Sequence, residues 1–172
     1  MARAYIGLGS NLAHPRRQLA RALRRIAGLR GVRVVARSPS YASAPVGSIP
    51  QPDYVNAVAA IDTTLAPRPL LERLHAIERI AGRRRDASTP RDCARTLDLD
   101  LLLYERRRMR LPMLTLPHPR MHERAFVLRP LADIAPTVTI PGRGLARRFL
   151  ARVRNQRIAR TQIAFPQLKS GR

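Results

Sequence analysis

Two carboxylates stand two residues apart in a strongly basic chain. Asp98 and Asp100 lie in an apolar run, residues 95–104, that follows the loop-like segment Ser88-Thr89-Pro90 and has the pattern of a buried strand. Because side chains alternate along a strand, the two carboxylates point to the same face, roughly 6–7 Å apart. Such a pair repels unless a positive group lies between its members, and Mg²⁺ is the natural partner when phosphate supplies further oxygens. The alternative is a solvated face on which each Asp pairs with an Arg.

The segment before the acid pair, residues 83–95, carries five arginines and lacks apolar periodicity, which predicts a loop. Guanidinium groups match phosphate oxygens in geometry. Arginines beside a metal-binding acid pair are typical of phosphoryl transfer, in which positioning and charge neutralisation account for most of the catalysis. An ordinary solvated basic loop is the alternative, and it explains the charges but not the acid pair.

His118 is a further candidate, because Pro117 and Pro119 restrict its backbone. An isolated His is usually structural. With Arg124 close behind it in the sequence, His118 becomes a better candidate for a phosphate contact.

Composition limits the class of protein. The chain has 172 residues, 45% of them apolar, which suits one domain with a hydrophobic core. We predict this domain over residues 1–164 and a frayed tail at 165–172. A single cysteine, Cys93, excludes an internal disulfide and a cysteine-based zinc site. The N-terminal residues lack the apolar core of a signal peptide, and no apolar run reaches transmembrane length. We therefore expect a cytoplasmic protein without a membrane partner.

The formal net charge of +22 favours anionic ligands. A nucleic-acid-binding protein would have such a charge. However, Lys169 is the only lysine, the arginines are spread over every segment, and aromatic residues make up only 4% of the chain. This pattern indicates a compositional bias and is weak evidence for nucleic acid.

The elements that must position these residues alternate between strands and helices. Gly9-Ser10-Asn11 is predicted to turn the chain and cap the first helix. In the strand at 54–63, Tyr54 and Asn56 share one face. In the helix that Pro67 opens, His75 and Glu78 lie three residues apart, and this spacing alone favours a surface contact. The predicted strands are residues 4–8, 32–41, 54–63 and the acid-pair run. The predicted helices include Leu19 to Ile26, residues 67–82, a helical turn within 120–127, a short helix at 130–134 and a last helix at 145–154. Residues 42–53 are predicted to form a loop.

Four motifs resemble a known family. They are residues 5–12 (YIGLGSNL), 51–57 (QPDYVNA), 95–100 (RTLDLD) and 116–126 (LPHPRMHERAF). In this order, within residues 4 to about 141, they resemble the 6-hydroxymethyl-7,8-dihydropterin pyrophosphokinases of folate biosynthesis. The resemblance implies an α+β fold, a ferredoxin-like-derived α/β/α sandwich with a mostly antiparallel central sheet and helices on both faces. It also implies a monomer.

The resemblance implies a reaction in which the pterin hydroxymethyl oxygen attacks the β-phosphorus of ATP and AMP leaves. Two Mg²⁺ ions would be held by Asp98 and Asp100. The remaining implied roles fall into three groups: Arg83 and Arg95 act on phosphates; His75, Glu78, His118 and Arg124 lie near or contact ATP; and Ser43, Val46, Tyr54, Asn56 and Phe126 form the pterin site.

One three-residue segment and one further position depart from the family pattern. Many members have Trp-Gly-Pro before the signature Arg, where this chain has Asp92-Cys93-Ala94 and no Trp at all, and Met113 replaces a frequent Arg. A paralogue that keeps the pterin pocket but has changed in activity is therefore an alternative. A basic nucleic-acid-binding module is a third hypothesis, and it leaves the acid pair unexplained.

Overall fold

One antiparallel sheet forms the centre of the structure. The computed structural model describes residues 1–47, 49–83 and 94–161, so the predicted tail at 165–172 lies outside it. Within these ranges the main sheet has six strands, and β2 pairs with β4 beside the path β10-β3-β4-β1-β5. All of its pairings are antiparallel. The strands are β1 (Ala2–Ser10), β2 (Val32–Arg37), β3 (Tyr41–Ser43), β4 (Tyr54–Thr63), β5 (Asp98–Tyr104) and β10 (Ile158–Arg160).

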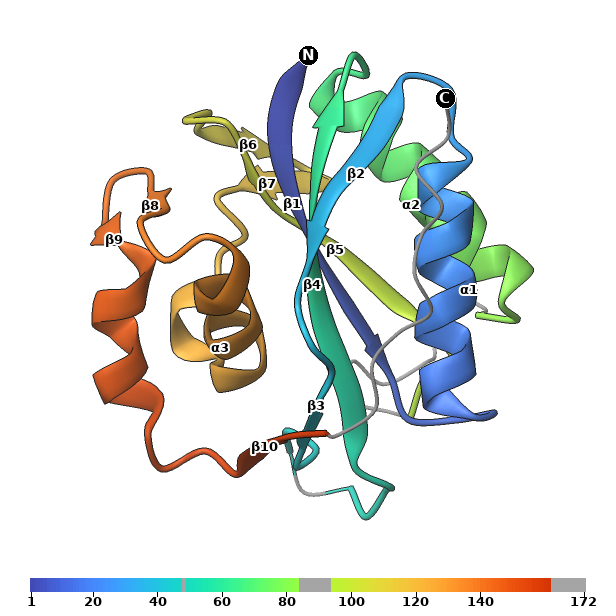
Figure 1. The fold of residues 1–172 in the computed structure, drawn as a ribbon, viewed down its shortest axis with the longest axis vertical. Helices are drawn as coiled ribbons and strands as arrows, with labels where there is room; N and C mark the ends of the chain where they lie inside the picture. The colour runs from blue at the N-terminus through green and yellow to red at the C-terminus, as the bar shows by residue number, and fades with distance from the viewer. Residues whose placement is uncertain (48, 84–93, 162–172) are drawn as a thin grey trace.

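Helices cover both faces of this sheet (Figure 1). On one face lie α1 (Pro15–Ala27) and α2 (Pro67–Ile80). The buried residues of α1 recur at helical spacing and share a core with Leu99 and Leu101 on the apolar face of β5 and with Leu97 directly before it. On the other face, α3 (Ala125–Ile134) and the 3-10 helix η2 (Ala146–Val153) pack over a second core that contains Val58 and Leu102. The predicted α+β fold, with helices on both faces of a mostly antiparallel sheet, is confirmed.

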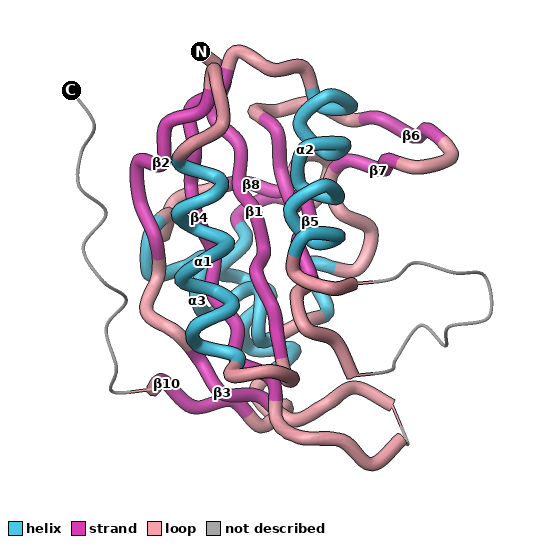
Figure 2. Tube along the Cα trace, turned by 90° about the vertical axis from the view of Figure 1, so that its right-hand side faces the viewer, coloured by secondary structure: helices cyan, strands magenta, loops and turns pink. Residues whose placement is uncertain are grey.

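Short elements after β5 form two small hairpins that are separate from the main sheet. The hairpin of β6 (Met109–Leu111) and β7 (Leu114–Leu116) projects from the body of the molecule (Figure 2). Next come the 3-10 turn η1 (Met121–Glu123) and a second hairpin, β8 (Thr139–Ile140) with β9 (Gly144–Leu145). The backbone N–H of His118 donates to the carbonyl of Leu102 at 2.9 Å, so β5 directly positions the segment after β7.

Several predicted boundaries are wrong. Gly9 and Ser10 do not turn the chain or cap a helix; they belong to β1, which pairs with β4 and β5 on its two sides and so extends further than its apolar residues indicate. The predicted strand at 32–41 ends at Arg37, and β3 follows as a separate strand after Ser38-Pro39-Ser40. Residues 125–134 form one helix with Pro130 inside it, rather than two short pieces.

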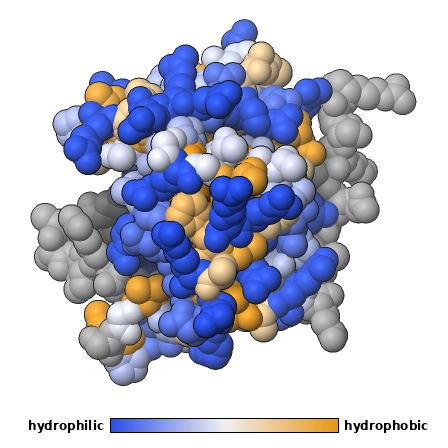
Figure 3. Space-filling view, turned by 90° about the vertical axis from the view of Figure 1, so that its left-hand side faces the viewer, coloured by the Kyte–Doolittle hydropathy of each residue, from blue (hydrophilic) through white to orange (hydrophobic). Residues whose placement is uncertain are grey.

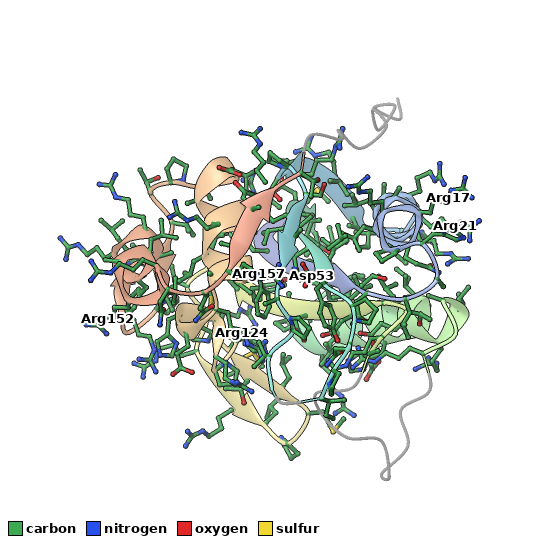
Figure 4. All side chains as sticks on the ribbon, turned by 90° about the horizontal axis from the view of Figure 1, so that it is seen from below. Arg17, Arg21, Asp53, Arg124, Arg152 and Arg157 are labelled. Atoms are coloured by element: carbon green, nitrogen blue, oxygen red, sulfur yellow. The ribbon has the colours of Figure 1, made fainter. Side chains whose placement is uncertain are left out.

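The arginines are spread over the surface. Arg17 and Arg21 project outward from α1, whereas Arg152 projects from η2 on the opposite side of the molecule (Figure 4). Hydrophilic side chains also dominate the face that carries α3 and η2, with smaller apolar areas between them (Figure 3). None of the helices within residues 1–47, 49–83 and 94–161 combines the length and apolar character needed to cross a membrane.

Candidate active site

A cavity of about 300 Å³ lies on the α3 side of the sheet, where β1, β4 and β5 meet the start of α3. Both carboxylates of the acid pair line it, together with polar side chains from β3 and β4. Its walls are formed by Gly7, Leu8, Gly9, Ser43, Ala44, Val46, Tyr54, Asn56, Ala57, Arg95, Asp98, Asp100, His118, Pro119, Arg120, Arg124, Phe126 and Val127. All the sequence-predicted site residues line this cavity except His75, Glu78 and Arg83.

Glycines of β1 form the floor beneath the acid pair. In the sheet register, Gly9 lies between Asn56 of β4 and Asp98 of β5, and Gly7 lies beside Asp100. A Cβ atom at Gly9 would stand only 3.2 Å from Oδ1 of Asn56. The missing side chain therefore keeps the space between the acid pair and Asn56 open. Sequence reasoning overlooked both glycines as site residues.

Two arginines balance the charge of Asp98. Nη1 of Arg95 lies 2.8 Å from Oδ2 of Asp98, and Nη1 of Arg83 contacts Oδ1. Burial raises the pKa of Asp98, but the charges and hydrogen bonds of Arg83 and Arg95 outweigh burial and hold this pKa below its ordinary value. Asp98 is therefore an ionised carboxylate with two cationic partners.

Within the part of the chain that the structure describes, no cationic group lies as close to Asp100. The nearest described cationic group is Nη1 of Arg124 at 3.8 Å, and Nε2 of His118 lies 3.9 Å away. Burial and the negative charge of Asp98 raise the pKa of Asp100 to about 7, and Arg124 offsets only part of this effect. A divalent cation between the two carboxylates would remove this repulsion.

His118 is a neutral hydrogen-bonding group. Burial, followed by the charge of Arg124, lowers the pKa of His118 to about 4. Its Nδ1 accepts from the backbone N–H of Arg120 at 3.3 Å, which assigns the ring proton to Nε2, on the side of Asp100. Nε2–H is thus a donor toward the cavity.

The far end of the cavity is polar and aromatic. Asn56 is buried, and its Nδ2 donates to Oγ of Ser43 at 2.8 Å. The hydroxyl of Tyr54 donates to Oε1 of Gln51 at 3.2 Å. Phe126 lines the cavity from α3, with the guanidinium of Arg124 5.5 Å from its ring centroid. This end could bind a flat, polar ring by hydrogen bonds at its edge and by stacking on its face.

Glu78 corrects one prediction. A surface contact with His75 was favoured, but Glu78 is only 1% exposed. Its Oε1 accepts from the backbone N–H of Leu99 at 2.8 Å and also contacts Arg83. Glu78 and Arg83 thus lie beside Asp98 but outside the cavity wall. His75 is half-buried and does not line the cavity.

The described residues contain no group of three or more His, Cys, Asp or Glu side chains that could hold a metal ion by themselves. Asp98 and Asp100 supply two carboxylates on one face of β5, and the raised pKa of Asp100 reflects its burial first and the charge of Asp98 second. The pair fits a hard cation that takes its remaining oxygens from a ligand and water, as Mg²⁺ does beside phosphates.

Comparison with known proteins identifies the family. A family model described as 7,8-dihydro-6-hydroxymethylpterin-pyrophosphokinase (HPPK) matches residues 5–136. A Pseudomonas aeruginosa protein named 2-amino-4-hydroxy-6-hydroxymethyldihydropteridine pyrophosphokinase is 52% identical over 139 residues, which cover 81% of this chain and 84% of that protein. The chain belongs to the HPPK family. A relative of the same name from Haemophilus influenzae is 48% identical over 141 residues, covering 82% of this chain and 86% of the relative.

Solved structures agree on the HPPK fold. A crystal structure of wild-type Plasmodium falciparum HPPK-DHPS with STZ-DHP superposes with a TM-score of 0.65 at 14% identity. The superposition covers 90% of this chain and 42% of that chain. At this identity the similarity concerns the fold alone.

The cavity of this HPPK-family chain includes residues that the sequence did not single out. Arg120 and Pro119 follow His118 in the wall, and Val127 follows Phe126. Asn11, which was assigned to a helix cap, instead joins two loops: its Oδ1 accepts from the N–H of Arg95 at 2.7 Å, and its Nδ2 donates to Oε1 of Gln51 at 2.9 Å. Pro119, Arg120 and Asn11 lie within the matched motifs and Val127 directly follows one of them, and only this position could have indicated these residues. The departure at Asp92 and Cys93 lies outside the described residues.

Proposed function

We propose that this chain transfers diphosphate from ATP to the hydroxymethyl group of 6-hydroxymethyl-7,8-dihydropterin in folate biosynthesis and releases AMP. Membership of the HPPK family and the names of its relatives support this proposal. The observation that carries it is one cavity with two different ends. The acid pair lies on β5 with Arg95 and Arg124 close to it, and the Asn56–Ser43 pair lies across β1 from it, on β4 and β3. Phe126 lines the cavity from α3, beside Arg124.

The pterin is assigned to the Asn56 end. The side-chain amide of Asn56 would hydrogen-bond the ring edge, and Ser43 holds that amide in position through the 2.8 Å bond to its Oγ. Phe126 would stack on the ring face, while Tyr54 and Val46 border the same space. This arrangement directs the hydroxymethyl group toward the acid pair.

The triphosphate is assigned to the end that Asp98 and Asp100 occupy. Arg95 and Arg124 line this part of the cavity and offer guanidinium groups to phosphate oxygens. Arg83 lies behind Asp98, and neutral His118 offers its Nε2–H as a donor. His75 and Glu78 are proposed to lie near the nucleotide, with Glu78 acting through Arg83 and the backbone of Leu99.

Asp98 and Asp100 are proposed to hold Mg²⁺, with two ions expected. Bound Mg²⁺ would neutralise phosphate charge and polarise the transferred group. Asp98 is ionised already because Arg83 and Arg95 hold its pKa low. Asp100 must lose its proton before it can bind a cation, since its pKa lies near 7 in the metal-free protein.

In the proposed step, the pterin hydroxyl oxygen forms a bond to the β-phosphorus. The bond between this phosphorus and the oxygen bridging to the α-phosphate breaks, so that AMP leaves with that oxygen. The hydroxyl proton passes to solvent. Arg95 and Arg124 would stabilise the charge that accumulates on the phosphate oxygens during this transfer. We further propose that the chain acts as a monomer in the cytoplasm and has no nucleic-acid or membrane partner.

The test is AMP release from ATP and Mg²⁺, with and without the pterin, by the unmodified chain and by Asp98→Ala. Asp62→Ala is the matched control, because Asp62 pairs with Arg3 and Arg33, outside the cavity. We expect AMP release that requires the pterin and Mg²⁺ and is lost only in Asp98→Ala. If pterin binds but no AMP appears, the chain is a paralogue with changed activity, and the proposal is wrong.

A further inference from the structure

A segment beyond the family match crosses the outer side of the cavity. Residues 156–161, called the C-terminal strap here, include β10, which lies along β3 (Figure 1). In this pairing Ile158 lies opposite Ser43, and the N–H of Ala44 donates to the carbonyl of Arg157 at 3.2 Å. Ser43 and Ala44 both line the cavity, whereas none of residues 156–161 does.

An ion pair joins the strap to the segment between β3 and β4. The guanidinium of Arg157 contacts both carboxylate oxygens of Asp53, at 2.7 and 2.6 Å, and the two side chains lie against each other (Figure 4). The hydrogen bonds from Arg157 hold the pKa of Asp53 below its ordinary value. Asp53 directly precedes Tyr54, a residue of the cavity wall.

Gln156 joins the strap to the start of α3. Its Oε1 accepts from the N–H of Ala125 at 2.8 Å, and its Nε2 donates to the carbonyl of Glu123 at 2.7 Å. No side chain from the adjoining residues caps this end of α3, so Gln156, 31 residues away, satisfies one of its free N–H groups. Ala125 lies between Arg124 and Phe126, which both line the cavity.

At its last residue the strap is fixed to the turn before β3. The N–H of Thr161 donates to the carbonyl of Ser40 at 2.9 Å, and the hydroxyls of the two residues lie 2.5 Å apart. The strap therefore contacts three separate parts of the cavity wall: the edge of β3, the chain before Tyr54 and the N-terminus of α3. The first two lie at the Asn56 end, whereas the N-terminus of α3 carries both Phe126 and Arg124, and Nη1 of Arg124 lies 3.8 Å from Oδ2 of Asp100.

We propose that the C-terminal strap is a positioning device for the pterin end of the site, and that Gln156 and Arg157 are its positioning residues. This inference rests on the proposed function, because it assigns the pterin to the Asn56 end. It predicts a selective effect for the Arg157 contacts: their loss lowers affinity for the pterin but leaves the nucleotide end unchanged. Loss of the Gln156 contacts acts on the N-terminus of α3, which carries Phe126 and Arg124, so it should lower affinity for the pterin more than affinity for ATP. A purely structural role would affect both substrates through global stability.

The experiment compares Gln156→Ala, Arg157→Gln and their combination with Arg154→Gln. Arg154 is exposed, precedes the strap and forms no hydrogen bond or ion pair with any described residue, so its substitution is a matched loss of charge. We expect the KM for the pterin to rise about two- to fivefold in Arg157→Gln, since exposed ion pairs are weak. The double variant should show a rise of roughly tenfold, because two further hydrogen bonds are lost. In Arg157→Gln the KM for ATP should stay at the value of the control, and in the double variant it should rise less than the KM for the pterin.

A charge swap tests the ion pair itself. Asp53→Arg combined with Arg157→Asp should recover part of the pterin affinity that Arg157→Gln loses, because the pair re-forms with opposite polarity. An equal rise in both KM values, or a pterin KM no different from that of Arg154→Gln, would show that the strap has no positioning role.

Amide hydrogen exchange separates this inference from the proposed function. The peptides that contain Ala44 and Ala125 should exchange faster in the double variant than in Arg154→Gln, while β5 should exchange at an unchanged rate. This result needs no substrate and holds even if the unmodified chain releases no AMP. Unchanged exchange at Ala44 and Ala125 would overturn the strap inference whatever the enzyme assay shows.

Discussion

Asp98 and Asp100 share one face of β5, yet their charges are balanced unequally. Asp98 contacts the guanidinium groups of Arg83 and Arg95, whereas the nearest described cationic nitrogen to Asp100 is 3.8 Å away. Accordingly, the pKa of Asp98 lies below its ordinary value and that of Asp100 rises to about 7. In the metal-free protein, the two carboxylates therefore have opposite effects on stability.

The first prediction follows from this asymmetry. Asp100→Asn should raise the free energy of unfolding of the metal-free protein by roughly 1–2 kcal/mol. This is less than the full pKa shift would give, because the side chain is one-third exposed and solvent screens its charge. Asp98→Asn should lower it by about 1–3 kcal/mol, because Arg83 and Arg95 lose their anionic partner. Urea unfolding with chelator present measures both. A change of the same sign in the two variants would contradict the assigned charge balance.

Both variants should release AMP at least about a hundredfold more slowly.

The second prediction concerns pH. The pKa of Asp100 is raised from 3.8 to about 7, so between these values the folded chain holds a proton that the unfolded chain has lost, and stability falls as pH rises. The pKa of His118 is lowered from 6.5 to about 4, so in that window the unfolded chain holds the extra proton, and stability falls as pH falls. In the unmodified protein, these two changes of the free energy of unfolding with pH oppose each other.

Substituting one of the two residues should reveal how the other one makes the free energy of unfolding depend on pH. Between pH 4.5 and 6.5, Asp100→Asn should become more stable as pH rises, and His118→Gln should become less stable, each by at most about 1.4 kcal/mol per pH unit. The measurement is urea unfolding at several pH values without metal. Parallel pH profiles for the two variants would show that one of the two pKa directions is wrong.

The acid pair could be predicted from the sequence because strand alternation is local. Once residues 97–101 are assigned to a strand, Asp98 and Asp100 must share the face opposite to Leu97, Leu99 and Leu101, as the structure has it. The buried stripe of α1 follows from helical periodicity in the same way. The resemblance then related four separate motifs, most of whose residues meet in one cavity.

The errors concern residues whose partners are distant in the sequence. Glu78 is buried because the N–H of Leu99 and the guanidinium of Arg83 reach it, and helix periodicity contains neither contact. β1 extends to Ser10 because β4 and β5 pair with it on both sides. The sequence predicts a helical turn within 120–127 and a separate short helix at 130–134, yet packing of Val127, Leu128 and Leu131 against the sheet keeps one helix. The strap could not be predicted, since its segment carries no recognisable motif.

The third prediction tests the glycine floor. Gly9→Ala places a Cβ atom 3.2 Å from Oδ1 of Asn56, so the amide must shift within the pterin end. The KM for the pterin should rise about five- to tenfold, because small displacements of a positioning group cost affinity. Gly7→Ala is the control: its Cβ would meet only the side chain of Leu102, at 3.4 Å or more. If the two variants have the same pterin KM, Gly9 does not serve to keep the space beside Asn56 open.

The fourth prediction separates Glu78 from an ordinary surface carboxylate. Glu78→Gln keeps the side-chain shape but removes the charge that faces Arg83 and weakens the acceptor for Leu99 N–H, so the free energy of unfolding should fall by about 1–3 kcal/mol. Glu72→Gln on the same helix is the matched control, since Glu72 is 63% exposed and pairs only with Arg68 among the described residues, at 3.2 Å. The control should change stability by less than about 0.5 kcal/mol.

Kinetics of the same two variants then test how Glu78 contributes to the site. Glu78 does not line the cavity, so it would act by orienting Arg83 beside Asp98 and by fixing the backbone of β5 between the two carboxylates. Glu78→Gln should therefore alter the KM for ATP and the Mg²⁺ dependence of AMP release, and leave the pterin KM close to that of Glu72→Gln. A selective change in the pterin KM would show that Glu78 acts on the opposite end of the cavity from the one to which its contacts lead.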